Sequence, residues 1–209
     1  MQSVIGRLDD SVMRMIVDSV DEASKSRLSD GANESSEASK SSLSGENEEG
    51  NMAIDKVKKY FDSFGMADQI KEFDVSSATV ELAAKAVGCE PERIAKTLSF
   101  KVDDQPILIV CAGDAKIANP KYKAEFGQKA KMLTPDEAVE LIGHAVGGVC
   151  PFAIKDGVKV YLDESLRRFD TIFPAAGSDN SAIELTPDEL EKYSQGFEKW
   201  VDVCKGWND

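Results

Sequence analysis

Apolar residues near the start of the chain recur at every fourth position, namely Val4, Leu8, Val12, Ile16 and Val20. This spacing predicts an amphipathic helical segment within residues 1–21, able to dock on a partner or on the rest of the chain. Residues 22–51 are rich in Ser, Glu, Asn and Gly and carry almost no large apolar side chain. We therefore predict a disordered linker there, followed by one globular domain over residues 52–209.

Within residues 52–209, short helical and alternating patterns follow one another. Helical spacing or helix-capping residues predict helices over 54–64, 79–87, from 119, 134–142, 186–193 and 197–204. Alternating or short apolar runs predict strands over 70–75, 95–102, 107–111, 158–162, 171–175 and 182–185. The elements lack regular β-α-β spacing, so the pattern favours an α+β fold with a mixed sheet or small barrel flanked by helices.

Composition narrows the class of protein. The net charge is −13, with −6 in residues 1–51 and −7 in residues 52–209, so any RNA would have to bind through a local basic patch. No apolar run approaches the roughly 20 residues of a membrane helix. Four cysteines without a CxxC pair, and a single histidine, argue against structural zinc and suit a reducing cytoplasm.

The segment from Gly143 to Phe152 is unusual because it combines three glycines and a proline with mostly apolar neighbours. A surface loop would be more polar, so we expect this loop to lie against the core. Glycines allow a backbone to approach a ligand closely, and successive N–H groups can bind a carbonyl or an oxyanion. The alternative is a buried crossover between a helix and a strand.

Lys96 begins a predicted strand whose other residues are mostly apolar. If the strand alternates, Lys96 shares a face with Leu98 and Phe100, which should point to the core. A lysine at that place could meet a substrate carbonyl or phosphate as a point charge. Alternatively, it extends its ammonium group from the strand end to water.

Three further residues have a chemical and a structural interpretation. Cys150 could be a nucleophile with His144 as its base, although no Asn or Asp completes a triad, and a small buried thiol is the simpler interpretation. His144 could equally complement the dipole of the preceding helix. Asp163 follows a predicted strand and could bind a substrate amine or cap the next helical turn.

Several short motifs, taken in order, resemble the YbaK/EbsC family, which is related to the editing domain inserted in bacterial prolyl-tRNA synthetases. They are Ala83-Ala84 with Gly88, Ile94 to Leu98, Gly113-Asp114, Gly147 to Phe152, Val160 to Asp163, Ala176-Gly177 and Ile183 to Thr186. The resemblance spans Met52 to about Tyr193. It implies a mixed sheet that closes toward a barrel, with helices outside.

The resemblance also implies an activity, namely hydrolysis in trans of mischarged aminoacyl-tRNA, typically Cys- or Ala-tRNA(Pro). It assigns the functional lysine to Lys96. It assigns substrate contacts to Gly147, Gly148, Val149, Cys150, Pro151, Asp163 and Gly177. It implies no metal or other cofactor, a cytoplasmic location, the tRNA 3′ end as partner and prolyl-tRNA synthetase as a candidate partner.

The sequence departs from the family at two places. Residues 72–75, before the first Ala-rich helix, read Glu-Phe-Asp-Val where some members carry a tyrosine, and Cys150 stands where others often carry serine or another small residue. Both departures leave the accepted amino acid open, and the oligomeric state is open too. A non-catalytic module that holds tRNA ends or a synthetase is the alternative function. A cysteine hydrolase using Cys150 and His144 is the third.

Overall fold

A computed structural model describes residues 41–207, with side chains from Met52 onward. The helical segment expected within residues 1–21 and the linker residues 22–40 lie outside this range. The helical elements are α2 (Ser41–Asp62), η1 (Ala67–Gln69), α3 (Val80–Val87), η2 (Pro91–Arg93), α4 (Asn119–Phe126), α5 (Pro135–Leu141), η3 (Glu164–Arg168) and α6 (Pro187–Tyr193). The strands are β1 (Ile70–Glu72), β2 (Ile94–Val102), β3 (Gln105–Ala112), β4 (Lys116–Ile117), β5 (Lys159–Asp163), β6 (Phe173–Pro174), β7 (Ser181–Ile183), β8 (Phe197–Val201) and β9 (Cys204–Lys205).

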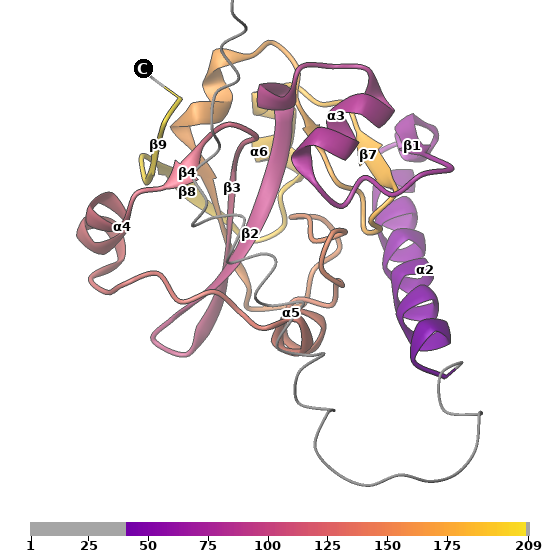
Figure 1. The fold of residues 1–209 in the computed structure, drawn as a ribbon, viewed down its shortest axis with the longest axis horizontal. Helices are drawn as coiled ribbons and strands as arrows, with labels where there is room; N and C mark the ends of the chain where they lie inside the picture. The colour runs from indigo at the N-terminus through magenta and orange to yellow at the C-terminus, as the bar shows by residue number, and fades with distance from the viewer. Residues whose placement is uncertain (1–40, 208–209) are drawn as a thin grey trace, which may run out of the picture. The chain divides into compact units, whose positions relative to one another are not determined.

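Five strands form one mixed sheet in the order β6-β2-β3-β5-β8 (Figure 1). The β2–β3 pair is an antiparallel hairpin, whereas β2–β6, β3–β5 and β5–β8 are parallel pairs. The sheet curls into a half-barrel with helices around it, which confirms the α+β class and the mixed sheet closing toward a barrel. Strand β3 lies at the centre of the sheet, and its residues 107–112 are fully buried or nearly so.

The first described helix is longer than the sequence indicates. α2 begins at Ser41, so residues 41–51, which we assigned to the disordered linker, belong to this helix. Its core-facing residues follow the helical period, since Ala53, Ile54, Val57 and Phe61 are all buried. The ring of Phe61 packs edge-on against Phe152, with 4.8 Å between ring centroids. α2 therefore supports the exit of the glycine-rich loop.

The predicted C-terminal helix over 197–204 is wrong, because this segment forms β8 and β9. β8 pairs with β5 through a bulge, in which Val160 opposes Phe197 but the next residue, Tyr161, opposes Lys199. Glu198 is the extra residue of this bulge. It makes Phe197 and Trp200 oppose Val160 and Leu162, so two apolar residues three positions apart lie on one face of the strand, as they would on a helix.

Helix-capping residues set most other boundaries as expected. Thr134 and Thr186 each form a reciprocal capping box with a glutamate three residues later, and Thr79 caps α3. Gly88 ends α3 in the left-handed conformation. α4 begins at Asn119, the expected position, with Pro120 in its first turn. Among the residues described, no helix is long and apolar enough to cross a membrane.

Candidate active site

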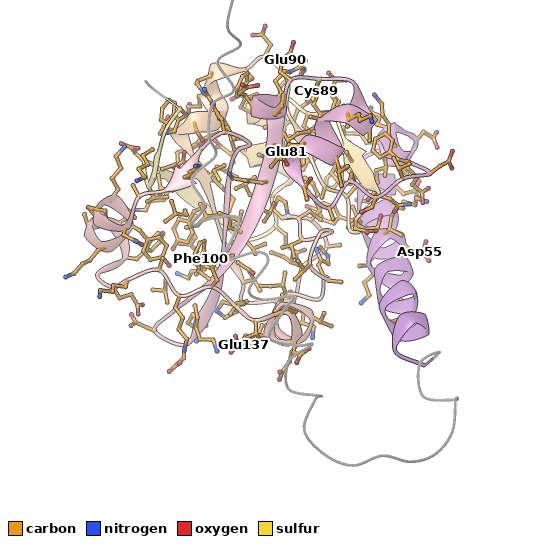
Figure 2. All side chains as sticks on the ribbon, viewed as in Figure 1. Asp55, Glu81, Cys89, Glu90, Phe100 and Glu137 are labelled. Atoms are coloured by element: carbon orange, nitrogen blue, oxygen red, sulfur yellow. The ribbon has the colours of Figure 1, made fainter. Side chains whose placement is uncertain are left out.

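Lys96 lies near the N-terminal end of β2, and its half-buried side chain points along the sheet to the end of β3. The Lys96 Nζ donates a hydrogen bond to the carbonyl oxygen of Gly113 at 3.0 Å. In Figure 2 this end of β2 lies near Cys89 and Glu90, whereas Phe100 and Glu137 mark the other end of the strand. The clean alternation expected for β2 does not hold, because Ser99 is buried and Leu98 is only half-buried.

Gly113 holds this arrangement in place and was not singled out from the sequence as a site residue. Its N–H donates to the Glu92 carbonyl at 3.2 Å, and a Cβ at this position would lie 1.9 Å from the Pro91 carbonyl oxygen. No side chain fits there, so η2 lies directly on the end of β3. The Gly113 carbonyl is consequently fixed, and it orients the Lys96 ammonium group.

The glycine-rich loop lies against the core, as expected. Residues 148–152 are buried, and only Val146 is well exposed, at 65%. A Cβ on Gly148 would lie 2.8 Å from the carbonyl carbon and oxygen of Gly177 and from the Ser178 Cα. Gly177, at φ +97°, in turn packs on the Ala53 backbone of α2, where a Cβ would lie 2.9 Å from the carbonyl. The two glycines thus form a close stack between the loop and α2.

Strand β6 connects this stack to Lys96. Its ladder with β2 pairs Ala95 with Pro174, and Lys96 is the next residue along β2. Gly177 follows Pro174 by three residues. The predicted residues Lys96, Gly148 and Gly177 therefore belong to one connected region at the β2–β6 end of the sheet.

Two polar runs, residues 76–79 and 178–181, lie against the glycine loop, and neither is recognisable as part of a site from the sequence. A Cβ on Gly147 would lie 2.9 Å from the Asp179 Cβ and 3.3 Å from the Ala78 Cβ. The Ser76 hydroxyl donates to the Asp179 carboxylate at 3.1 Å. The two polar runs, residues 76–79 and 178–181, resemble ordinary turns in sequence, and only their pairing across the fold reveals a joint role.

Two of the four loop amides that we expected to face a substrate are already used inside the loop. Gly148 N–H donates to the Ala145 carbonyl at 3.1 Å, and Cys150 N–H donates to the His144 Nδ1 at 3.3 Å. Within the described residues, the N–H groups of Gly147 and Val149 donate no hydrogen bond. These two amides are alternate groups of one short segment, and both are left without an acceptor in the part of the chain that the structure describes.

Cys150 and His144 do touch, but neither is placed for nucleophilic chemistry. The Cys150 Sγ lies 3.6 Å from the His144 Nδ1, and both side chains are buried. Burial raises the pKa of the Cys150 thiol to about 12. Burial, and to a smaller degree the charge of Lys56, lowers the pKa of His144 to about 4. A neutral thiol and a neutral imidazole at neutral pH form a packing contact rather than an ion pair.

Asp163 is fully buried, and both of its carboxylate oxygens bind main-chain groups. One oxygen accepts from Ser165 N–H at 3.0 Å and caps η3, and the other accepts from Val203 N–H at 2.9 Å. We expected a substrate contact from the resemblance and a helix cap as the alternative. The geometry is that of the cap, because the carboxylate is fully buried and each oxygen already accepts from a main-chain N–H.

Pro151 is buried behind the loop, and its carbonyl accepts from Gln195 N–H at 2.9 Å, so it anchors the loop rather than lining it. Within residues 41–207, His, Cys, Asp and Glu side chains form no group of three that could hold a metal ion. Lys96 follows Ala95, which pairs with Pro174 in the β2–β6 ladder, and Asp179 contacts Gly147 of the loop.

Comparison with known proteins identifies the family. The family model described as "Aminoacyl-tRNA editing domain" matches residues 75–193. The uncharacterized protein YwhH of Bacillus subtilis (strain 168) is 54% identical over 158 residues, which cover 75% of this chain and 99% of YwhH. The proline–tRNA ligase of Lactiplantibacillus plantarum is 26% identical over 126 residues, which are 60% of this chain but only 22% of the ligase.

Solved structures support the same family. A crystal structure of a proposed trans-editing enzyme for prolyl-tRNA synthetase superimposes with a TM-score of 0.66 at 28% identity, covering 74% of this chain and 98% of that one. The matched region spans the glycine loop, Lys96 and Gly177, and the resemblance to the YbaK/EbsC proteins is confirmed. This chain therefore belongs to the aminoacyl-tRNA editing domain family.

Proposed function

We propose that the protein is a free-standing deacylase that hydrolyses the ester of mischarged aminoacyl-tRNA, with Cys- or Ala-tRNA(Pro) as the favoured substrates. The observation that carries the proposal is the junction of Lys96, the free amides of Gly147 and Val149, and the Gly148–Gly177 stack at one end of the sheet. The relatives that are proline–tRNA ligases support tRNA(Pro) as the tRNA. Such a substrate would place the protein in the cytoplasm.

The reaction needs little from the protein beyond positioning and charge, because an aminoacyl ester is already activated. Water attacks the ester carbonyl carbon, negative charge develops on the carbonyl oxygen, and the bond to the ribose oxygen breaks as that oxygen takes a proton. The N–H groups of Gly147 and Val149 would stabilise the developing charge. The Lys96 ammonium would supply a fixed positive charge beside the ester or its neighbouring phosphate.

Proton transfer is assigned to the RNA. His144 and Asp163 are both buried and engaged in structural contacts, and the Asp179 carboxylate beside Gly147 accepts from the Ser76 hydroxyl, so we assign none of the three as the base. The 2′-hydroxyl of the terminal ribose would activate the attacking water or, in a cysteinyl ester, the substrate's own thiol. An acyl group held against the glycine loop would be selected by size, at roughly 1–3 kcal/mol for each methylene.

The test is a deacylation panel with Cys-, Ala- and Pro-tRNA(Pro) and several correctly charged tRNAs. We expect release from Cys- or Ala-tRNA(Pro) well above the uncatalysed rate and little release from Pro-tRNA(Pro). Release at the background rate from every charged tRNA would contradict the proposal. Tight binding of tRNA or of prolyl-tRNA synthetase without release would favour the non-catalytic module.

A further inference from the structure

A strongly basic segment stands out in this acidic chain. Residues 115–131 contain five lysines and one acidic residue, whereas the whole chain carries a net charge of −13. The segment forms β4, α4 and the loop that follows (Figure 1). Four of the lysines bear no ion pair with any described residue, namely Lys116, Lys123, Lys129 and Lys131.

Three of the acidic residues in or beside this segment are each paired with a lysine or an arginine. Glu125 pairs with Lys199, and Asp202 pairs with Lys121 at 2.7 Å. Asp114 receives a two-pronged contact from Arg168. Asp103 borders the far end of the segment, where its carboxylate accepts from Gln128 at 3.4 Å. The unpaired lysines therefore face solvent as net positive charge.

Two of the lysines lie directly opposite each other across a strand pair. In the antiparallel β4–β9 pair, Lys116 opposes Lys205. Opposed residues project from the same face with their Cβ atoms about 5 Å apart, and like charges there are destabilising. Neither lysine has a carboxylate partner among the described residues, and Lys205 is exposed. An arrangement of this kind is suited to an anion that bridges both ammonium groups.

The pair lies next to the candidate site. Lys116 follows Gly113, whose carbonyl binds the Lys96 ammonium, by only three residues, a reach of at most about 11 Å. Beyond the pair, Lys123 and Lys129 line a hollow of about 490 Å³ together with Asn119, Pro120 and Ala130. Along the chain, Lys116, Lys123 and Lys129 therefore follow Gly113 in that order.

We propose that Lys116, Lys205, Lys123 and Lys129 form the surface that binds the phosphate backbone of the tRNA acceptor end. The inference rests on the proposed function for its choice of partner. An RNA backbone carries regularly spaced phosphates that lead away from the aminoacylated ribose, and this matches the order of the lysines. Contacts to phosphates are not sequence-specific, so this surface provides affinity while the junction at Lys96 selects the ester.

The experiment measures the affinity of uncharged tRNA(Pro) at several salt concentrations for wild-type protein and for a variant with Lys116→Gln and Lys205→Gln. We expect the double variant to bind about tenfold or more weakly at low salt, with the slope of log affinity against log salt reduced by about 1.4, for two single-strand phosphate contacts. It should melt no lower than wild type, because it loses a like-charge pair.

Lys59→Gln is the control, since Lys59 is an exposed lysine of α2 without an ion pair in the described part of the chain, and α2 and α4 lie on opposite sides of Figure 1. It should bind like wild type. An unchanged salt slope in the double variant, or an equal loss in Lys59→Gln, would overturn the inference. Because the tRNA is uncharged, lysine-dependent binding without any deacylation would overturn the proposed function alone.

Discussion

Gly148 packs directly on Gly177, so closely that a Cβ on Gly148 would lie 2.8 Å from the Gly177 carbonyl oxygen. Gly148 does not have a positive φ, so the requirement for glycine here comes from contact and not from backbone conformation. The contact ties the glycine loop to the segment that follows β6, and through β6 to Lys96. The geometry of the candidate site therefore depends on this one contact.

Gly148→Ala should displace the loop from Gly177. We expect a loss of about 1–3 kcal/mol in the free energy of unfolding, typical of overpacking, together with a large loss of deacylation by the folded protein. Gly157→Ala is the control: Gly157 has φ +86° but nothing within 4 Å of its Cβ position. This control should lower the free energy of unfolding by about 1–2 kcal/mol, because alanine is strained at a positive φ, and it should leave the rate of deacylation unchanged. Equal activity in both variants would show that the stack does not shape the site.

Asp163→Asn should lower stability rather than substrate affinity. The Asp163 carboxylate accepts hydrogen bonds from the main-chain N–H groups of Ser165 and Val203. In the asparagine variant, an NH₂ group would face one of these two N–H donors, so that hydrogen bond would be lost. We expect a loss of about 2–4 kcal/mol in urea denaturation, with KM for charged tRNA unchanged at a temperature where the variant is folded. A stable variant with a much higher KM would restore the substrate-contact interpretation.

His144 should make the protein less stable in mild acid. Its pKa is lowered to about 4 in the fold, against about 6.5 in the unfolded chain, so between these values only the unfolded chain binds the proton. The free energy of unfolding should fall by about 2 kcal/mol as the pH decreases from 7 to 5, and this contribution should level off below pH 4.

His144 is the only histidine in the sequence, which makes the assignment direct. In His144→Asn, the Asn oxygen can still accept from Cys150 N–H, but the group no longer titrates. Urea denaturation of this variant at pH 7 and pH 5 should show that most of the decrease in the free energy of unfolding between the two pH values has disappeared. A slope as steep as that of wild type would assign the pH dependence to carboxylates instead.

Cys150→Ala should keep most of the deacylase activity. The thiol is buried, has a raised pKa and contacts His144 and the main chain of Phe152 and Gly177, so its removal leaves a small cavity and little chemical effect. We expect the rate of deacylation to stay within a few-fold of wild type. If Cys150→Ala abolished activity while Lys96 variants retained it, the protein would be a cysteine hydrolase.

The sequence predicted those elements whose signals are local. The capping boxes at Thr134 and Thr186 and the Gly88 cap specify helix ends within a few residues of chain. The helix predicted over 197–204 failed because a bulge in β8, produced by its pairing with β5, altered the spacing of apolar residues. Pairing between distant segments leaves no signal in a single stretch of sequence.

The same distinction applies to the candidate site. The glycine content of residues 143–152 correctly indicated a loop against the core. Which amides remain free depends on the Ala145 carbonyl and on the His144 ring, and these contacts are visible only in three dimensions. The role of Gly113 was likewise hidden, because it arises from the approach of Pro91 and from the Lys96 side chain.

The most direct test of the account is the single-turnover rate of deacylation for Lys96→Met on the preferred mischarged tRNA(Pro), compared with wild type and with Lys101→Met. Lys101 lies in the same strand but pairs with Glu137 at 2.7 Å, away from the candidate site. The account predicts a loss of about 100-fold or more for Lys96→Met and a near wild-type rate for Lys101→Met. A wild-type rate in Lys96→Met would contradict it.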